Sequence, residues 1–105
     1  MSAALRKIRA AVCLRAAGAC ESCGAWVGEN GESGHLDHAR GRARSETVES
    51  CWLLCVPCDD ERTHNRPTSA HWLRLFAAHC ADYGFAAEHE RALARLQFVT
   101  ARGAA

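Results

Sequence analysis

The hydrophobic and polar positions of this chain predict helices at its two ends. Apolar residues recur at helical spacing in residues 2–17, and again in 69–83 and 86–99. Gly18 and Gly84 follow two of these periodic segments directly, as is typical of residues that end a helix. We therefore expect one N-terminal helix and two C-terminal helices.

The middle of the chain has shorter and less regular patterns. Residues 25–27 and 35–39 are predicted short strands, and we expect them to pair with each other as a hairpin. Residues 47–54 form an apolar patch without a clear period. A further helix is predicted from residue 57 to about residue 65, because proline suits a first helical turn and Pro67 prevents continuation.

These elements predict a small α+β fold. The chain has 105 residues, which is the length of one domain with a modest core. We expect residues 1–66 to form a metal-stabilised core that includes the N-terminal helix. Residues 67–105 are then a helical extension packed on that core.

The cysteines change this picture, because the chain has seven of them. Four are arranged as two Cys-x-x-Cys pairs, which is the spacing of a tetrahedral structural zinc site. Redox-active or unligated cysteines are the alternative. The odd number of cysteines and the absence of a signal-like N-terminal segment favour reduced thiols and zinc over disulfides. The predicted zinc ligands are Cys20, Cys23, Cys55 and Cys58.

Net charge and hydropathy give less information about function than the cysteines do. The net charge is +1, which does not by itself indicate a nucleic-acid partner. No apolar run is long enough to span a membrane, so we expect no membrane partner. The reduced cysteines favour an intracellular, cytoplasmic protein.

Three segments of the chain form a combined pattern. They are the segment that leads into Cys20-Glu-Ser-Cys23-Gly, then His35-Leu-Asp37-His38, and then Trp52-Leu-Leu-Cys55-Val-Pro-Cys58 with the Arg62-Thr63 that follows. Taken together, they resemble HNH endonucleases that carry a four-cysteine zinc site, and the resemblance covers about residues 9–66. The family fold is a ββα-metal unit, also called the His-Me finger, in which a hairpin and a helix hold a divalent ion. Small members of the family occur in bacteria and phages.

The resemblance implies a role for four residues. His38 corresponds to the general base, a role that suits a neutral imidazole near neutral pH. Asp37 and Asp59 correspond to ligands of a catalytic Mg²⁺ or Mn²⁺, where the family usually has His or Asn at the position of Asp59. Ser50 stands where the family has a central asparagine, which ties the backbone of the loop. Serine offers a shorter and weaker version of that hydrogen bond.

Two further histidines are candidates near this site. Asp60 and His64 share a helix face and form an alternative ligand pair for the cation, although a solvated polar face is the simpler interpretation. His35 precedes Asp37 by two residues, so both side chains belong to one strand face. His35 is therefore either a contact of the metal or phosphate, or an ordinary exposed histidine.

Arginines near the proposed site are candidate DNA contacts. Such contacts to phosphate position the nucleic acid without reading its sequence, so they predict salt-sensitive binding. A solvated charged loop is the alternative. The candidates are Arg40, Arg42, Arg44 and Arg62.

Three hypotheses for function follow. The first is a metal-dependent DNA endonuclease with one catalytic cation. The second is a zinc-stabilised nucleic-acid-binding module with weak or no cleavage, which the departures at Ser50 and Asp59 favour. The third is a zinc scaffold that binds protein through Trp72 and the C-terminal helices. The Asp37-His38 pair argues against this hypothesis, because a scaffold does not need it.

Overall fold

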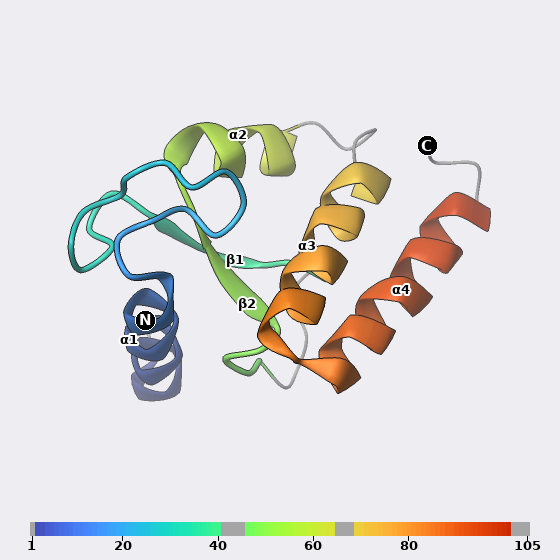
Figure 1. Cartoon of the computed structure of the whole chain (residues 1–105), viewed down its shortest axis with the longest axis horizontal. Coiled ribbons are helices and arrows are strands. Elements are labelled where there is room, and N and C mark those ends of the chain that lie inside the picture. Colours follow the sequence, from blue (N-terminus) through green and yellow to red (C-terminus); the bar gives the residue numbers. More distant parts are fainter. Residues whose placement is uncertain (1, 41–45, 65–68, 102–105) are drawn as a thin grey trace. The chain divides into compact units, whose positions relative to one another are not determined.

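The computed structural model of the chain describes residues 2–40, 46–64 and 69–101 (Figure 1). These residues form four helices and one two-stranded antiparallel sheet, so the fold is small α+β as predicted. In chain order the elements are α1 (Ala3–Ala16), β1 (His35–His38), β2 (Cys51–Leu54), α2 (Val56–His64), α3 (Ser69–Tyr83) and α4 (Ala86–Ala101).

The chain divides into two compact units, residues 1–59 and 60–105. The first unit contains α1, both strands and the first turn of α2, and the second contains α3 and α4. The division falls inside α2, between Asp59 and Asp60. The packing of the C-terminal helices on the metal-binding core stays a prediction.

Helix α1 begins and ends where its flanking residues predict. The Ser2 hydroxyl accepts a hydrogen bond from the Leu5 N–H at 3.1 Å and so caps the first turn. At the other end Ala17 and Gly18 both have positive φ, 52° and 86°, which stops the helix. Gly18 is needed for a second reason, because a Cβ atom there would lie 2.5 Å from the Trp26 ring.

The predicted hairpin between residues 25–27 and 35–39 is wrong. Strand β1 lies beside β2 instead (Figure 1). Their register places His35 opposite Leu54 and His38 opposite Cys51. Residue Trp26 makes only an isolated bridge to Ala19. The sequence of residues 51–54 does not predict a strand, because all four residues are buried. A strand buried on both faces has no alternation of apolar and polar residues.

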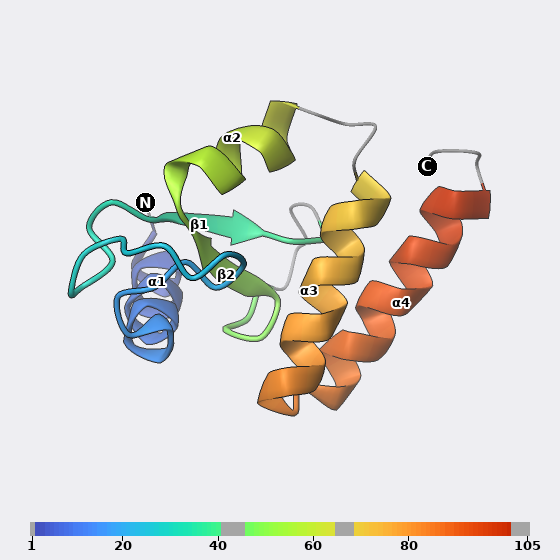
Figure 2. The same cartoon turned by 45° about the horizontal axis from the view of Figure 1, so that its top comes forward.

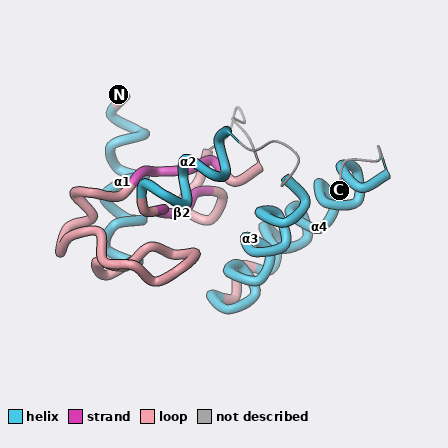
Figure 3. Tube along the Cα trace, turned by 90° about the horizontal axis from the view of Figure 1, so that it is seen from above, coloured by secondary structure: helices cyan, strands magenta, loops and turns pink. Residues whose placement is uncertain are grey.

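The core of the first unit forms where α1 meets β2. Val12 of α1 is fully buried, as is Leu53 of β2. The long loop between α1 and β1, drawn in pink in Figure 3, passes close to Leu53 at Gly31 and Gly34. Arg9 of α1 ties this loop, because its Nη2 donates to the carbonyl oxygens of both glycines at 3.2 Å.

The second unit is a helical hairpin. Helices α3 and α4 lie side by side (Figures 1 and 2) and are joined by a turn at Gly84, whose φ is 75°. Phe76 of α3 and Ala92 of α4 are fully buried. The predicted helices at 69–83 and 86–99 are thus confirmed, α4 being two residues longer. No helix in the described ranges is long and apolar enough to cross a membrane.

Candidate functional site

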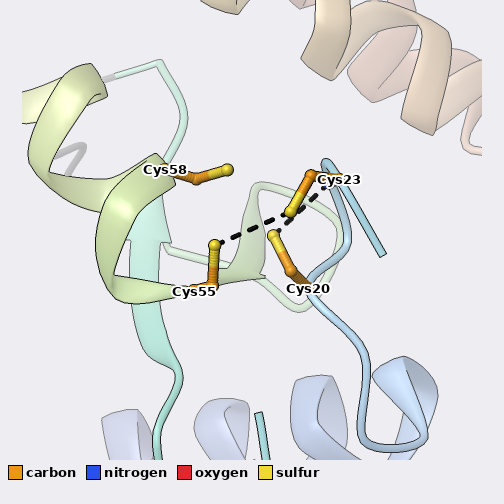
Figure 4. A group of neighbouring side chains, drawn as sticks. All are labelled: Cys20, Cys23, Cys55 and Cys58. Atoms are coloured by element: carbon orange, nitrogen blue, oxygen red, sulfur yellow. Dashed lines mark hydrogen bonds between the residues drawn. The ribbon is translucent and has the colours of Figure 1, made fainter. Parts of the chain in front are cut away.

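The two Cys-x-x-Cys pairs come together in the first unit, although a long stretch of chain separates them. One pair lies in the turn after α1, and the other lies at the start of α2 (Figure 4). The four Sγ atoms all lie within 4.8 Å of one another. The residues of this cluster are Cys20, Cys23, Cys55 and Cys58.

The cluster has the dimensions of a tetrahedral zinc site. A Zn–S bond of ~2.3 Å places neighbouring sulfur atoms of a tetrahedron ~3.8 Å apart. The Sγ atoms of Cys23 and Cys55 are 3.7 Å apart. All seven cysteines are free thiols, so no disulfide competes for these sulfurs. The residues present therefore fit a metal ion such as zinc.

A tight turn prepares the first pair of ligands. The Cys23 N–H lies 3.5 Å from the Cys20 Sγ, and the Gly24 N–H donates to the Cys20 carbonyl at 2.9 Å. Gly24 has a φ of +82°, a conformation that side chains other than glycine rarely adopt. This turn directs the thiols of Cys20 and Cys23 toward the second pair.

The thiol pKa values show why a cation is suited to this cluster. Burial raises the pKa of Cys20, but hydrogen bonds from the N–H groups of Cys23, Cys55 and Ser22, and from the Cys23 thiol, together bring it down to about 7. Burial raises the pKa of Cys58, and the neighbouring thiols of Cys55 and Cys23 raise it further. Four thiolates cannot share so small a volume unless a cation compensates their charge.

A buried ion pair supports the cluster, and sequence reasoning missed it. Arg15 of α1 makes a bidentate contact with the Glu21 carboxylate. Its Nε donates to Oε2 at 2.8 Å and its Nη2 donates to Oε1 at 2.7 Å. Its guanidinium also donates to the carbonyls of Val48 and Cys51. Glu21 in turn accepts from the Leu53 N–H at 3.0 Å. An acidic residue between two zinc-binding cysteines is the only sequence signal of this arrangement.

The predicted cation ligand Asp37 lies in a protected position. It is opposite Trp52 in the sheet, it is 9% exposed, and its Oδ2 accepts from the Trp52 indole N–H at 2.8 Å. The indole N–H of Trp52 therefore holds the Asp37 carboxylate in place. The register explains the contact, because directly opposite residues of an antiparallel pair project on the same face.

The predicted general base His38 lies at the end of β1, with its side chain largely covered. Its Nδ1 is 3.4 Å from the Cys51 Sγ and 3.6 Å from the Glu46 Oε1. Cys51 is the residue opposite His38 in the sheet. Both of these contacts are made by the Nδ1 atom of the imidazole.

The remaining predicted ligands lie on α2. The Asp59 Oδ2 is 2.9 Å from the Nδ1 of His35, which joins the first turn of α2 to β1. The Nδ1 of His64 is 3.0 Å from the backbone oxygen of Asp60. Within the described ranges, the four cysteines are the only group of three or more His, Cys, Asp or Glu side chains close enough for one ion. The second cation site therefore stays a prediction.

Ser50 closes a turn rather than contacting the catalytic candidates. Its Oγ accepts from the Thr47 N–H at 2.9 Å and donates to the Thr47 carbonyl at 3.1 Å. Ser50 is 7% exposed, so these bonds are shielded from water. The side chain thus binds the backbone of the loop that leads into β2.

The candidate DNA contacts are only partly described. Arg40 and Arg62 are both partly exposed, one just after β1 and the other in the last turn of α2. Arg42 and Arg44 lie outside the described residues. Binding of nucleic acid by these arginines stays a prediction.

Replacing Trp52 with phenylalanine tests the role of the Asp37 contact. The substitution keeps most of the buried ring but removes the N–H that the carboxylate accepts. We expect a loss of about 1–3 kcal/mol in the free energy of unfolding, because a buried acceptor loses its donor. Urea unfolding of the zinc-loaded protein measures it. Trp26→Phe is the control, since Trp26 is 72% exposed, and an equal effect of both changes would contradict the assignment.

Comparison of the chain with protein-family models, with curated proteins and with solved structures found no match.

Proposed function

We propose that this protein is a metal-dependent endonuclease that hydrolyses DNA phosphodiester bonds, in the manner of the HNH endonucleases that its motifs resemble. The observation that carries the proposal is the succession of β1, β2 and α2. In it, Asp37 and His38 occupy neighbouring positions of β1, and Asp59 on α2 contacts β1 through His35. Two carboxylates and one histidine are thereby carried by one small ββα unit.

In this proposal His38 is the general base. The Nδ1 atom of its ring lies beside Cys51 and Glu46. Proton transfer from water to the imidazole leaves the water oxygen free to attack phosphorus, and the bond from phosphorus to the departing oxygen then breaks. Such positioned base catalysis contributes about 10²- to 10⁴-fold to a rate.

Asp37 and Asp59 would hold the Mg²⁺ or Mn²⁺ ion, since carboxylate oxygen is the donor that hard cations prefer. The ion, when bound, would supply positive charge against the phosphate and the departing oxygen. The donor chemistry fits, but each carboxylate already has one oxygen in a hydrogen bond, to Trp52 and to His35. Binding of the cation would therefore compete with these two donors.

A zinc-stabilised nucleic-acid-binding module is the second candidate. It is favoured because a cation would compete with Trp52 and His35 for the two carboxylates. Asp37 is buried against Trp52, and within the described ranges neither Asp37 nor Asp59 belongs to a group of three His, Cys, Asp or Glu side chains close enough for one ion. A module that only binds DNA needs the zinc cluster and the arginines, but not an accessible Asp37. Its binding would weaken steeply as salt is raised.

Cleavage of supercoiled plasmid separates the two candidates. Zinc-loaded protein is incubated with plasmid and Mg²⁺, Mn²⁺ or no added cation, and His38→Ala is assayed beside it. We expect relaxed or linear product that requires the added cation, and a loss of about 10²-fold or more in the variant. His71→Ala is the matched control. His71 is an exposed histidine of α3, so this variant should cleave plasmid as wild type does.

The contrary outcome is equally clear. If wild type and His38→Ala are both inert with every cation, yet both shift DNA at low salt, the endonuclease proposal fails and the binding module stands. If His71→Ala loses as much activity as His38→Ala, His38 is not the base.

A further inference from the structure

Trp26 presents an aromatic ring to solvent in the first unit. The residue is 72% exposed, although its ring lies against Gly18, where a Cβ atom would be 2.5 Å from the ring. Its backbone bridges to Ala19, in the turn that follows α1. Among the residues that the structure describes, no other aromatic ring or cation packs against it. The ring is therefore positioned by the backbone and open to a partner.

A cavity of about 620 Å³ lies along α1 and reaches the end of the helix that leads to this ring. The helix lines it from Arg6 to Ala17, a span of about 17 Å at the helical rise, and the loop side contributes Glu29. Leu14, which also lines the cavity, is 84% exposed. Ala17 precedes the glycine on which the Trp26 ring lies. Two exposed apolar side chains, Leu14 and Trp26, are thus carried by the same end of the helix.

Helix α1 carries only positive charge. Its sequence contains four basic residues and no acid. Arg15 is paired with Glu21, whereas Arg6 and Lys7 are exposed. The guanidinium of Arg9 is held by two backbone carbonyls, and no carboxylate of the described residues lies within ion-pair distance of it. The exposed apolar surface at one end of α1 is therefore accompanied by a cationic surface along the same helix.

A single strand of nucleic acid has the chemistry that matches both surfaces. Its phosphates are anionic, and each of its bases has an aromatic face that can stack on a tryptophan ring. In a duplex the base faces are covered by neighbouring base pairs, and only base edges and phosphates are presented. An exposed tryptophan beside a cationic helix therefore favours an unpaired strand over a duplex.

We infer that Trp26, Leu14 and the cations of α1 form a docking surface for single-stranded DNA. Trp26 stacks on an unpaired base, and Arg6 and Lys7 contact phosphates. This inference deepens the proposed endonuclease function, and its consequence for the choice of substrate rests on that function. It names DNA with an unpaired segment as the preferred substrate class.

Binding of a short oligonucleotide tests the docking surface without any need for cleavage. Zinc-loaded protein is titrated into a labelled DNA strand of about twelve nucleotides, or into the matching duplex, at low salt without Mg²⁺ or Mn²⁺. Fluorescence anisotropy should show about 10-fold tighter binding of the single strand. Trp26→Leu should weaken binding of the strand by about 5- to 100-fold and leave binding of the duplex unchanged. Trp26→Phe should retain most of the affinity, because a phenylalanine ring still stacks.

Two further measurements locate the strand on the protein. Trp52 and Trp72 are 1% and 4% exposed, so quenching of tryptophan fluorescence by the added strand should come from Trp26. Lys7→Gln should lower the slope of log affinity against log salt by about 0.7, the value for one phosphate contact of a single strand. Arg95→Gln is the matched control. Arg95 is an exposed cation of α4, so the slope of this variant should equal that of wild type.

Three results would overturn the inference. One is equal affinity for strand and duplex, or no binding of either. Another is an equal effect of Trp26→Phe and Trp26→Leu at unchanged thermal midpoints, which would make Trp26 a packing residue. The third is a dimer that Trp26→Leu dissociates while no strand binds, which would assign the surface to a second copy of the chain. If Trp26→Leu fails to fold, tryptophan quenching and the salt slope of Lys7→Gln still decide.

Plasmid cleavage separates this inference from the proposed function. If the strand binds through Trp26 but no plasmid is cleaved with any cation, the endonuclease proposal fails and the docking surface stands. If wild type and Trp26→Leu cleave plasmid equally while strand and duplex bind equally, only the docking surface fails.

Discussion

Serine in place of Cys55 is expected to abolish stoichiometric zinc binding and to destabilise residues 1–59 more than any single change outside the four cysteines. Structural zinc sites contribute an apparent free energy of ~10–16 kcal/mol at neutral pH, and much of it depends on each thiolate. Cys55 is 7% exposed and its Sγ is 3.7 Å from that of Cys23, so no other described thiol can take its place without moving the backbone. The small core around β2 has little else to offset the loss.

Two measurements check this expectation. Metal analysis of the purified protein should find one zinc per chain in wild type and much less in Cys55→Ser, and a chelator should lower the thermal midpoint of wild type only. Cys13→Ser is the matched control, because Cys13 is only partly buried and lies outside the cluster. Equal zinc content and equal thermal midpoints in the two variants would contradict a four-cysteine site.

Replacing Arg15 with alanine is expected to cost about 3–5 kcal/mol of unfolding free energy, although the variant keeps every zinc ligand. The Glu21 side chain is 2% exposed, and Arg15 is its ion-pair partner at 2.7 Å. Removing one partner of such a pair leaves a buried charge without compensation. The carbonyls of Val48 and Cys51 lose their donor at the same time.

Urea unfolding of the zinc-loaded variant measures this loss. Lys7→Ala is the control within the same helix, because Lys7 is exposed and should change stability by less than about 0.5 kcal/mol. A double variant, Arg15→Met with Glu21→Gln, should recover part of the loss, since neither charge is then buried alone. If Arg15→Ala is as stable as Lys7→Ala, the ion pair does not hold α1 to the cysteine turn.

Predictions from the sequence succeeded where the signal is local. The α3 helix occupies residues 69–83 as its apolar period predicts, and Gly84 ends it. The α1 helix ends at Ala16, one residue before the predicted end, and Ala17 precedes Gly18 in the left-handed conformation. Helix limits depend on neighbouring residues along the chain, so a periodic pattern and a terminating glycine are sufficient evidence.

Strand pairing failed because its evidence is not local. The segment at 51–54 is buried on both faces and so lacks the alternation that marks a half-buried strand. Trp26 and Val27 have strand-forming side chains, but Trp26 is 72% exposed and bridges only to Ala19. Which segment lies beside β1 depends on which residues fill the core, and that is a property of the whole unit.

The α+β class, the helices and the four cysteines of the metal cluster are predictable from the amino-acid sequence, because helix periodicity and Cys-x-x-Cys spacing report geometry within a few residues. The partners of the remaining candidates depend on the folded chain: Trp52 for Asp37, His35 for Asp59, and Glu46 with Cys51 for His38. These contacts join residues that are remote along the chain. They are set by strand register and by the path of the loops, and a side chain's chemistry changes with the neighbour that folding brings to it.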